Sequence, residues 1–315
     1  MTEYSPALQQ LLADVKKMHP QEIQINFPKE EKIGYLRHDY GQYYVADGKL
    51  QVDVYDQTDI EYTISHELLH FMLMFDNTPQ ASVNVTSGDQ ELDATLTATG
   101  IDLYDTVLHD RVYKEQRKRG FITEATEEIY LKGVMERFPK EDGPDQWLVL
   151  RVLTLLDALV FFQGGDEDII ALFAQNNPES YRYAATLYQV MNEKPLKTNG
   201  AVRRAIVRLW DGMDQVLRDA GYAPMGLREF MTLSPVLSER QTRLQLNQLF
   251  ELYHSQLKDN LKFKDAYIGR FKADGQNSFV INLPADITPE EMKQVYEQPI
   301  GAYLQELGFT YLIRQ

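Results

Sequence analysis

The stretch TDIEYTISHELLHFMLMF, residues 58–75, contains the pentapeptide HELLH at positions 66–70. Residues four apart on an α-helix lie one turn apart on the same face, so His66 and His70 can point two imidazoles at one ion. Glu67 follows His66 directly and can reach a water molecule on that ion. Two neutral nitrogen ligands, an open coordination position and a carboxylate are the parts that a catalytic zinc site requires.

A helix over this stretch is predicted by its start signal and by its apolar pattern. Thr58 and Glu61 have the spacing of a capping box, which places the helix start near Asp59. The two histidines then fall in the middle turns. Apolar residues recur at helical spacing and mark a buried stripe, namely Ile64, Leu68, Phe71, Met72 and Phe75. We therefore expect a buried helix with histidines that open into a cleft. The alternative is a core helix on which both histidines form only ordinary hydrogen bonds.

Composition excludes several classes of function. The 315 residues carry a formal net charge of −15 and no cysteine, so thiolate metal sites and cysteine nucleophiles are excluded. The acidic balance argues against a nucleic-acid partner. The longest apolar run, 147–162, is too short to span a bilayer and is interrupted by Arg151 and Asp157. With no signal peptide recognisable at the N-terminus, we expect a cytoplasmic protein with no membrane partner; the oligomeric state stays open.

The segments around the HELLH helix predict a small sheet before it and a second long helix after it. Asp47-Gly48 is a strong hairpin signal between two alternating segments. The polar stretch 76–90 is expected to be a loop, followed by a helix over 91–119 that Gly100 bends and Gly120 ends. Before the HELLH helix we expect a helix over 5–18 and strands over 22–27, 34–38, 42–46 and 50–55.

The second half predicts mostly helices and then a small mixed unit. Asp142-Gly143-Pro144 is a boundary signal. One expected helix starts at Thr123, and four others cover 146–162, 178–192, 199–220 and 238–262. A capping box of Ser238 and Gln241 opens the last of them. The last fifty residues predict a β-β-α-β unit with a turn at Asp274-Gly275, a helix from Thr288 to about Leu307, and a final strand over 309–313. We therefore expect three parts, covering 1–142, 143–262 and 263–315.

A sheet followed by a helix with the HELLH pattern resembles the zincin metallopeptidases over roughly residues 20–120. Some likeness to ImmA/IrrE-type peptidases and to an uncharacterised bacterial HExxH group accompanies it. The resemblance implies that His66 and His70 bind zinc and that Glu67 is the general base and proton shuttle. It also implies that an edge strand beside the motif helix pairs with an extended peptide substrate.

A catalytic zinc needs a third protein ligand, and three candidates follow the motif. Glu91 has the spacing of the third ligand in thermolysin-like and ImmA/IrrE-type relatives, but an acid at a helix start is also expected from the helix dipole. Asp105 and His109 share one helix face a turn apart, as in the bacterial HExxH group. Glu91 and Asp105 are about 21 Å apart along a straight helix, so one ion cannot bind both. We favour His109, with Asp105 as an alternative ligand or as a carboxylate that orients His109 or His70.

The sequence thus predicts an α+β, zincin-like protein with a small N-terminal antiparallel-type sheet, the HExxH helix, a mostly helical region and a small C-terminal unit. The predicted function is a zinc-dependent peptidase that hydrolyses peptide bonds with a zinc-bound water and Glu67 as general base, acting on a peptide or protein substrate. The alternative is a non-catalytic regulatory or scaffold protein with a zincin-like fold and a structural metal or none.

Overall fold

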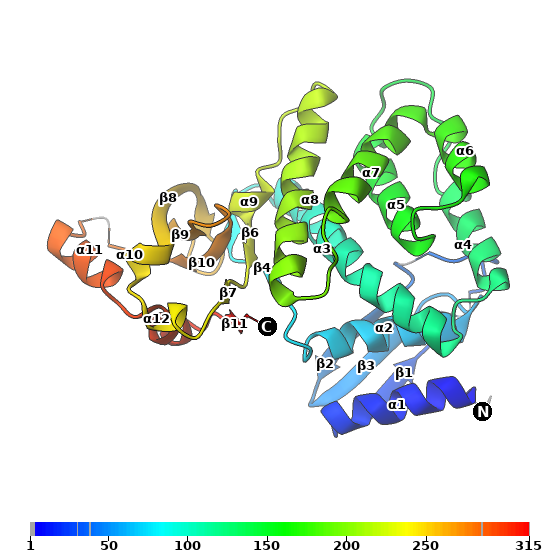
Figure 1. The fold of residues 1–315 in the computed structure, drawn as a ribbon, viewed down its shortest axis with the longest axis horizontal. Coiled ribbons are helices and arrows are strands. Elements are labelled where there is room, and N and C mark those ends of the chain that lie inside the picture. The colour runs from blue at the N-terminus through cyan, green and yellow to red at the C-terminus, as the bar shows by residue number, and fades with distance from the viewer. Residues whose placement is uncertain (1–3, 30, 38, 285, 315) are drawn as a thin grey trace. The chain divides into compact units, whose positions relative to one another are not determined.

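The computed structural model describes residues 4–29, 31–37, 39–284 and 286–314, and it shows an α+β protein (Figure 1). The chain forms two compact units, each made of two segments. The first unit combines 1–76 with 108–185, and the second combines 77–107 with 186–315. The expected division at 142 and 262 stays a prediction.

The first unit contains a three-stranded sheet, with strand order β1-β3-β2. The expected antiparallel type is correct only for β2 and β3, because β1 runs parallel to β3. The Asp47-Gly48 turn joins β2 to β3 with positive φ angles of 51° and 74°, as a tight hairpin of this kind requires. The expected strand over 34–38 is wrong for 34–37, which form no strand, and residue 38 lies outside the described residues. The strands are β1 (Ile23–Asn26), β2 (Gly41–Ala46) and β3 (Lys49–Val54).

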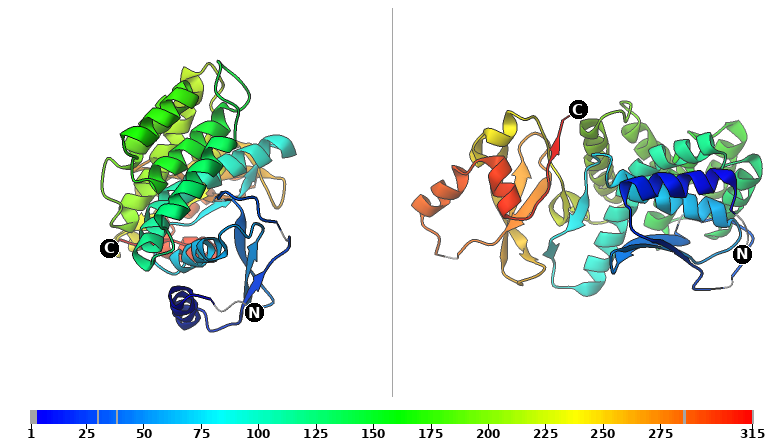
Figure 2. Two further views of the ribbon diagram at one scale, coloured as in Figure 1. Left: turned by 90° about the vertical axis from the view of Figure 1, so that its right-hand side faces the viewer. Right: turned by 90° about the horizontal axis from the view of Figure 1, so that it is seen from below.

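Two helices, α1 (Pro6–Met18) and α2 (Ile60–Leu73), lie on the same side of this sheet (Figure 2). Alternate residues of β3 supply the sheet's part of the core, since Leu50, Val52 and Val54 are fully buried. The HELLH motif therefore lies on a helix that packs directly against the sheet.

The start of α2 is where the sequence predicts it, but its cap is different. Asp59 is the N-cap residue and accepts a hydrogen bond from the backbone N–H of Tyr62. Thr58 instead accepts one from the backbone of Gly34. Glu61 accepts hydrogen bonds from Ser5 at the start of α1, which ties the two helices together. The predicted capping box is thus wrong because both of its side chains find partners far away in the chain.

The rest of the first unit is helical, and its core helix is α5. Residues 151–161 of α5 are all buried, including Arg151, which pairs with Asp145 at 2.7 Å. The side chain of Thr123 caps α4, as expected. The bounds are α4 (Glu124–Glu136), α5 (Leu148–Phe161) and α6 (Glu167–Asn176). Two further helices belong to this unit only in part, namely α3 (Gln90–Arg119) with its C-terminal part and α7 (Pro178–Met191) with its N-terminal part.

The second unit is organised around α8 (Asn199–Asp219) and three small sheets. Trp210 of α8 is fully buried and donates its indole N–H to the carbonyl of Gly100 at 3.0 Å. The largest sheet has the order β10-β9-β8-β5, whereas β4 pairs with β6 and β11 pairs in parallel with β7. The strands are β4 (Ala81–Val83), β5 (Val85–Thr86), β6 (Met231–Leu233), β7 (Val236–Leu237), β8 (Phe250–Asp259), β9 (Asp265–Phe271), β10 (Asn277–Ile281) and β11 (Leu312–Ile313).

Several expectations for the second unit are wrong. The predicted helix over 238–262 is a short 3₁₀ turn, one helical turn and the long strand β8. Ser238 and Gln241 do form reciprocal cap hydrogen bonds, but they open only the 3₁₀ turn. The predicted loop 76–90 contains β4 and β5, and the predicted C-terminal helix is divided before Pro299. The short helices are α9 (Leu227–Phe230), η1 (Gln241–Arg243), α10 (Leu246–Leu249), α11 (Pro289–Tyr296) and α12 (Ile300–Glu306).

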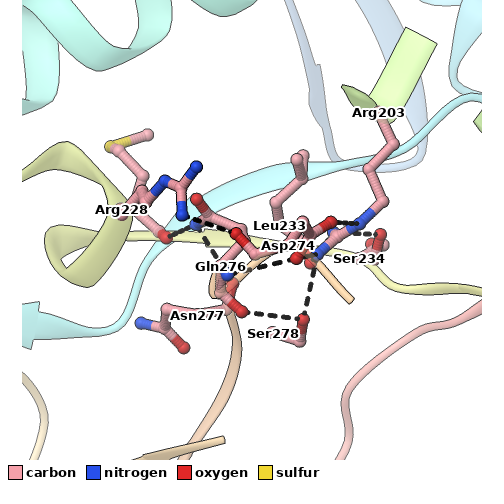
Figure 3. Close-up of polar contacts among 9 residues, drawn as sticks. Arg203, Arg228, Leu233, Ser234, Asp274, Gln276, Asn277 and Ser278 are labelled. Carbon is pink, nitrogen blue, oxygen red and sulfur yellow. Dashed lines mark hydrogen bonds and ion pairs between the residues drawn. The ribbon is translucent and has the colours of Figure 1, made fainter. Parts of the chain in front are cut away.

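A buried arginine holds the strands of this unit to α8 (Figure 3). Arg203 donates to the backbone carbonyls of Leu233 and Ser234 at 2.7 and 2.9 Å, and it pairs with Asp274 at 3.0 Å. One guanidinium thus joins α8, the segment between β6 and β7, and the turn between β9 and β10. None of the helices that the structure describes is both long and apolar enough to cross a bilayer.

Candidate metal centre

The two motif histidines lie side by side in the middle of α2. His66 and His70 are only 4% and 7% exposed, and their ring centroids are 4.8 Å apart. This is the one-turn spacing that the sequence predicts, with both rings on one face of the helix.

His109 of α3 completes a group of three imidazoles. It is 3% exposed, and its ring centroid lies 4.8 Å from that of His66 and 4.9 Å from that of His70. One ligand atom from each of the three residues lies within 4.8 Å of the others, so the group can hold a metal ion. Of the third-ligand candidates, His109 is the one that the fold brings to the motif.

The two helices are held in this position by a buried glutamine. Gln116, two turns beyond His109 on α3, donates to the carbonyl of Tyr62 at 3.0 Å and to the hydroxyl of Ser65 at 2.9 Å. Both acceptors lie on α2 within one turn of His66. The carboxamide thus sets the position of one helix along the other, and with it the distance between the ligands.

A carboxylate from α5 orients His109. Asp157 contacts Nδ1 of His109 at hydrogen-bond distance, and it also accepts hydrogen bonds from the hydroxyls of Tyr113 at 2.8 Å and Tyr130 at 2.5 Å. With Nδ1 protonated toward the carboxylate, Nε2 keeps its lone pair for a metal. In the sequence, Asp157 stands out only as a charge in an apolar helix. A buried charge of this kind needs partners, which was the available signal.

The tyrosines around this carboxylate stay protonated at neutral pH. Burial, and then the negative charge of Asp157, raise the pKa of Tyr113 and Tyr130 well above 10. Both hydroxyls therefore donate to Asp157 at neutral pH. The ring of Tyr130 stacks on Phe161 with centroids 3.7 Å apart, so the hydroxyl is held by packing as well.

Glu67 is buried beside the first residue of β2. A Cβ atom at Gly41 would lie 2.7 Å from Oε1 of Glu67 and 2.7 Å from Cγ2 of Thr63, so only glycine leaves room for the carboxylate at this place. β2 is an edge of the described sheet. The carboxylate that follows His66 in the motif therefore lies where an edge strand begins.

The other two candidates for the third ligand lie elsewhere on α3. Glu91 is exposed in the first turn of α3 and precedes His109 by 18 residues, about 27 Å along the helix. Asp105 is half-buried one turn before His109 and is not a member of the three-histidine group. Its expected role in orienting His109 or His70 stays a prediction.

Three neutral imidazoles are a donor set that suits Zn²⁺. Zn–N bonds of about 2.0–2.1 Å place two ligand nitrogens roughly 3.3 Å apart in a tetrahedral site. The three ligand atoms lie within 4.8 Å of one another, so they must move closer together to reach this spacing. With three protein ligands, a fourth position remains for water or substrate.

Comparisons of the chain with protein-family models, with curated proteins and with solved structures give no match. The interpretation of the centre therefore rests on its own residues and geometry.

Proposed function

We propose that this protein is a zinc-dependent peptidase with a centre formed by His66, His70 and His109. The observation that carries the proposal is the convergence of these three buried imidazoles next to Glu67. A zinc ion held there would supply Lewis-acid activation of water and of a carbonyl group. Glu67 would take the proton of the attacking water and pass it to the leaving amine.

The arrangement of the first unit supports a peptide as substrate. β2 is antiparallel to β3, is an edge of the sheet, and begins at Gly41 beside Glu67. An edge strand offers unpaired backbone N–H and C=O groups, and an extended peptide can pair with them. A peptide bound in this way would run past the carboxylate. The mixed sheet next to the motif helix is also consistent with the zincin-like fold.

The proposal is tested first by measuring metal content and then by measuring hydrolysis. Purified wild-type protein should contain about one zinc per chain by elemental analysis. Single alanine variants of His66, His70 and His109 should each lose most of it while circular dichroism stays unchanged. A panel of quenched-fluorescence peptides then tests cleavage. Unchanged zinc content in the three variants would reject the metal centre itself.

A second candidate is a structural metal in a non-catalytic scaffold protein. The burial of Glu67 together with all three histidines favours it, because structural sites are closed. The variant Glu67→Gln separates the two functions, since it has nearly the same shape and leaves the ligands in place. If wild type cleaves peptides and this variant does not, at equal zinc content, the peptidase is supported. If the panel is not cleaved by zinc-loaded wild type, the scaffold is supported.

A further inference from the structure

The turn between β8 and β9 presents two large apolar side chains to solvent. Leu261 is 83% exposed and Phe263 is 71% exposed, more than any other large hydrophobic residue among those that the structure describes. Single exposed apolar residues are common on protein surfaces, but two in one five-residue turn form a concentrated apolar tip. We call residues 260–264 the hairpin tip.

Hydrogen bonds from neighbouring strands hold the conformation of the hairpin tip. The backbone N–H of Phe263 donates to the carbonyl of Asp259 at 2.9 Å, and the Asp259 carboxylate accepts from the N–H groups of Leu261 and Lys262. Asn260 donates its side-chain amide to the carbonyl of Val83 at 2.8 Å. Hydrogen bonds therefore tie the tip to Asp259 at the end of β8 and to Val83 of β4.

Phe263 adopts a strained backbone conformation in this turn. Its φ angle is +54°, in the left-handed region that glycine and asparagine adopt with least strain. A phenylalanine there is both strained and exposed, so neither backbone conformation nor core packing explains it. Local strain at an exposed apolar side chain is typical of a position where the side chain serves a contact.

The tip is also basic, in contrast to the chain as a whole. Lys262 and Lys264 are exposed on it, and neither forms an ion pair with any residue within the described ranges. The nearby acidic groups are already engaged, since Asp259 caps the turn and Asp265 pairs with Lys258. A pocket of about 660 Å³ next to the tip is lined by Lys262, Lys264, Asp265, Asn282, Leu283 and Pro284. Positive charge and an apolar tip thus occur at one place on a chain of net charge −15.

We propose that the hairpin tip binds the surface of an anionic phospholipid bilayer. Leu261 and Phe263 would enter the boundary between headgroups and acyl chains, while Lys262 and Lys264 contact lipid phosphates. A specific protein interface usually needs about 20–30 residues a side, far more than the five residues of this turn, whereas contact with a bilayer surface needs only a few apolar and basic side chains. This differs from the sequence-based expectation of no membrane partner, which was drawn from the lack of an apolar run long enough to span a bilayer and did not consider contact with its surface. Screening over about 8 Å limits repulsion by acidic residues elsewhere.

Flotation of the full-length protein with vesicles tests the proposal directly. One vesicle contains only phosphatidylcholine, and the other contains equal parts of phosphatidylcholine and phosphatidylglycerol. Wild type should float with the anionic vesicles and remain unbound with the neutral ones. Each of Lys262→Glu and Lys264→Glu should weaken binding by at least about fivefold, and added salt should weaken it further. Lys293→Glu, on the exposed face of α11, is the matched control and should bind as wild type does.

The variant Phe263→Asn tests whether weaker vesicle binding could be caused by unfolding instead of by loss of the apolar side chain. Asparagine tolerates the left-handed conformation, so thermal stability should be equal to or higher than that of wild type while vesicle binding falls by at least about tenfold. Wild type that floats with neither vesicle, or Phe263→Asn that floats like wild type, would overturn the proposal. If wild type does not float but Phe263→Asn changes the oligomeric state in size-exclusion chromatography, the tip belongs to a protein interface instead.

Discussion

Replacing Asp157 by asparagine should weaken metal binding without unfolding the protein. The carboxylate now serves three donors: Nδ1–H of His109 on one oxygen, and the hydroxyls of Tyr113 and Tyr130 on the other. An asparagine has the same shape but only one acceptor oxygen. If that oxygen stays with the two tyrosines, the amide N–H₂ faces His109 and forces its proton to Nε2.

The expected magnitude follows from this change of tautomer. A proton on Nε2 blocks the ring nitrogen that Asp157 leaves available for a metal, so this proton must return to Nδ1 before His109 can bind. Loss of such a partner of a metal ligand typically lowers metal affinity by about 10–100-fold, or about 1.4–2.7 kcal/mol. The loss of one charge-assisted hydrogen bond should lower the free energy of unfolding of the metal-free protein by about 1–3 kcal/mol.

Competition with a chromophoric chelator measures the zinc affinity, and urea unfolding of the metal-free protein measures its stability. The matched control is Asp145→Asn, which removes the partner of buried Arg151 in the same unit but does not touch the histidines. We expect the control to bind zinc within about twofold of wild type. If Asp157→Asn also binds zinc within about twofold of wild type, and ¹⁵N spectra show the His109 proton still on Nδ1, then Asp157 does not set the tautomer of His109.

Three further predictions concern other positions. Gly41→Ala should leave the zinc content unchanged but lower peptide hydrolysis by about 100-fold, because its Cβ displaces Glu67; full activity would show that the carboxylate is not needed there. Tyr130 keeps its raised pKa only when folded, so its contribution to stability is complete below pH 10 and falls by about 1.4 kcal/mol per pH unit above it. In urea unfolding at increasing pH, the difference between wild type and Tyr130→Phe should shrink accordingly, and a constant difference would contradict the assignment. Arg203→Met should lower the free energy of unfolding by about 3–5 kcal/mol, because Asp274 and two carbonyls lose their buried partner; a loss below about 1 kcal/mol in the same assay would show that the ion pair is dispensable.

The sequence was sufficient for features that depend on neighbouring residues. The HELLH helix begins where predicted, since apolar spacing and a polar N-terminal residue are local signals. The turn at Asp47-Gly48 has the predicted positive φ angles for the same reason. The choice of His109 also used a local pattern, because His109 and Asp105 share one helix face a turn apart.

Features that depend on distant partners were missed. Nothing near Asp157 in the chain indicates that it meets a histidine 48 residues earlier. The parallel pairing of β1 with β3 likewise joins segments that are distant in the chain, so local patterns do not reveal it. The segment after Ser238 shows the same limit most clearly. Its capping hydrogen bonds form as predicted, and yet only η1 and α10 precede the long strand β8. Pairing with β9 and β5 there outweighs local helix propensity.

The division into two compact units has a practical consequence for optical measurements. The chain has two tryptophans, and each unit contains one: Trp147 in the first and Trp210 in the second. Trp147 is partly exposed whereas Trp210 is fully buried, so their emission should differ in wavelength and in quenching by iodide. Replacing either one by phenylalanine would leave a single fluorophore, and each half of the molecule would then report its own melting.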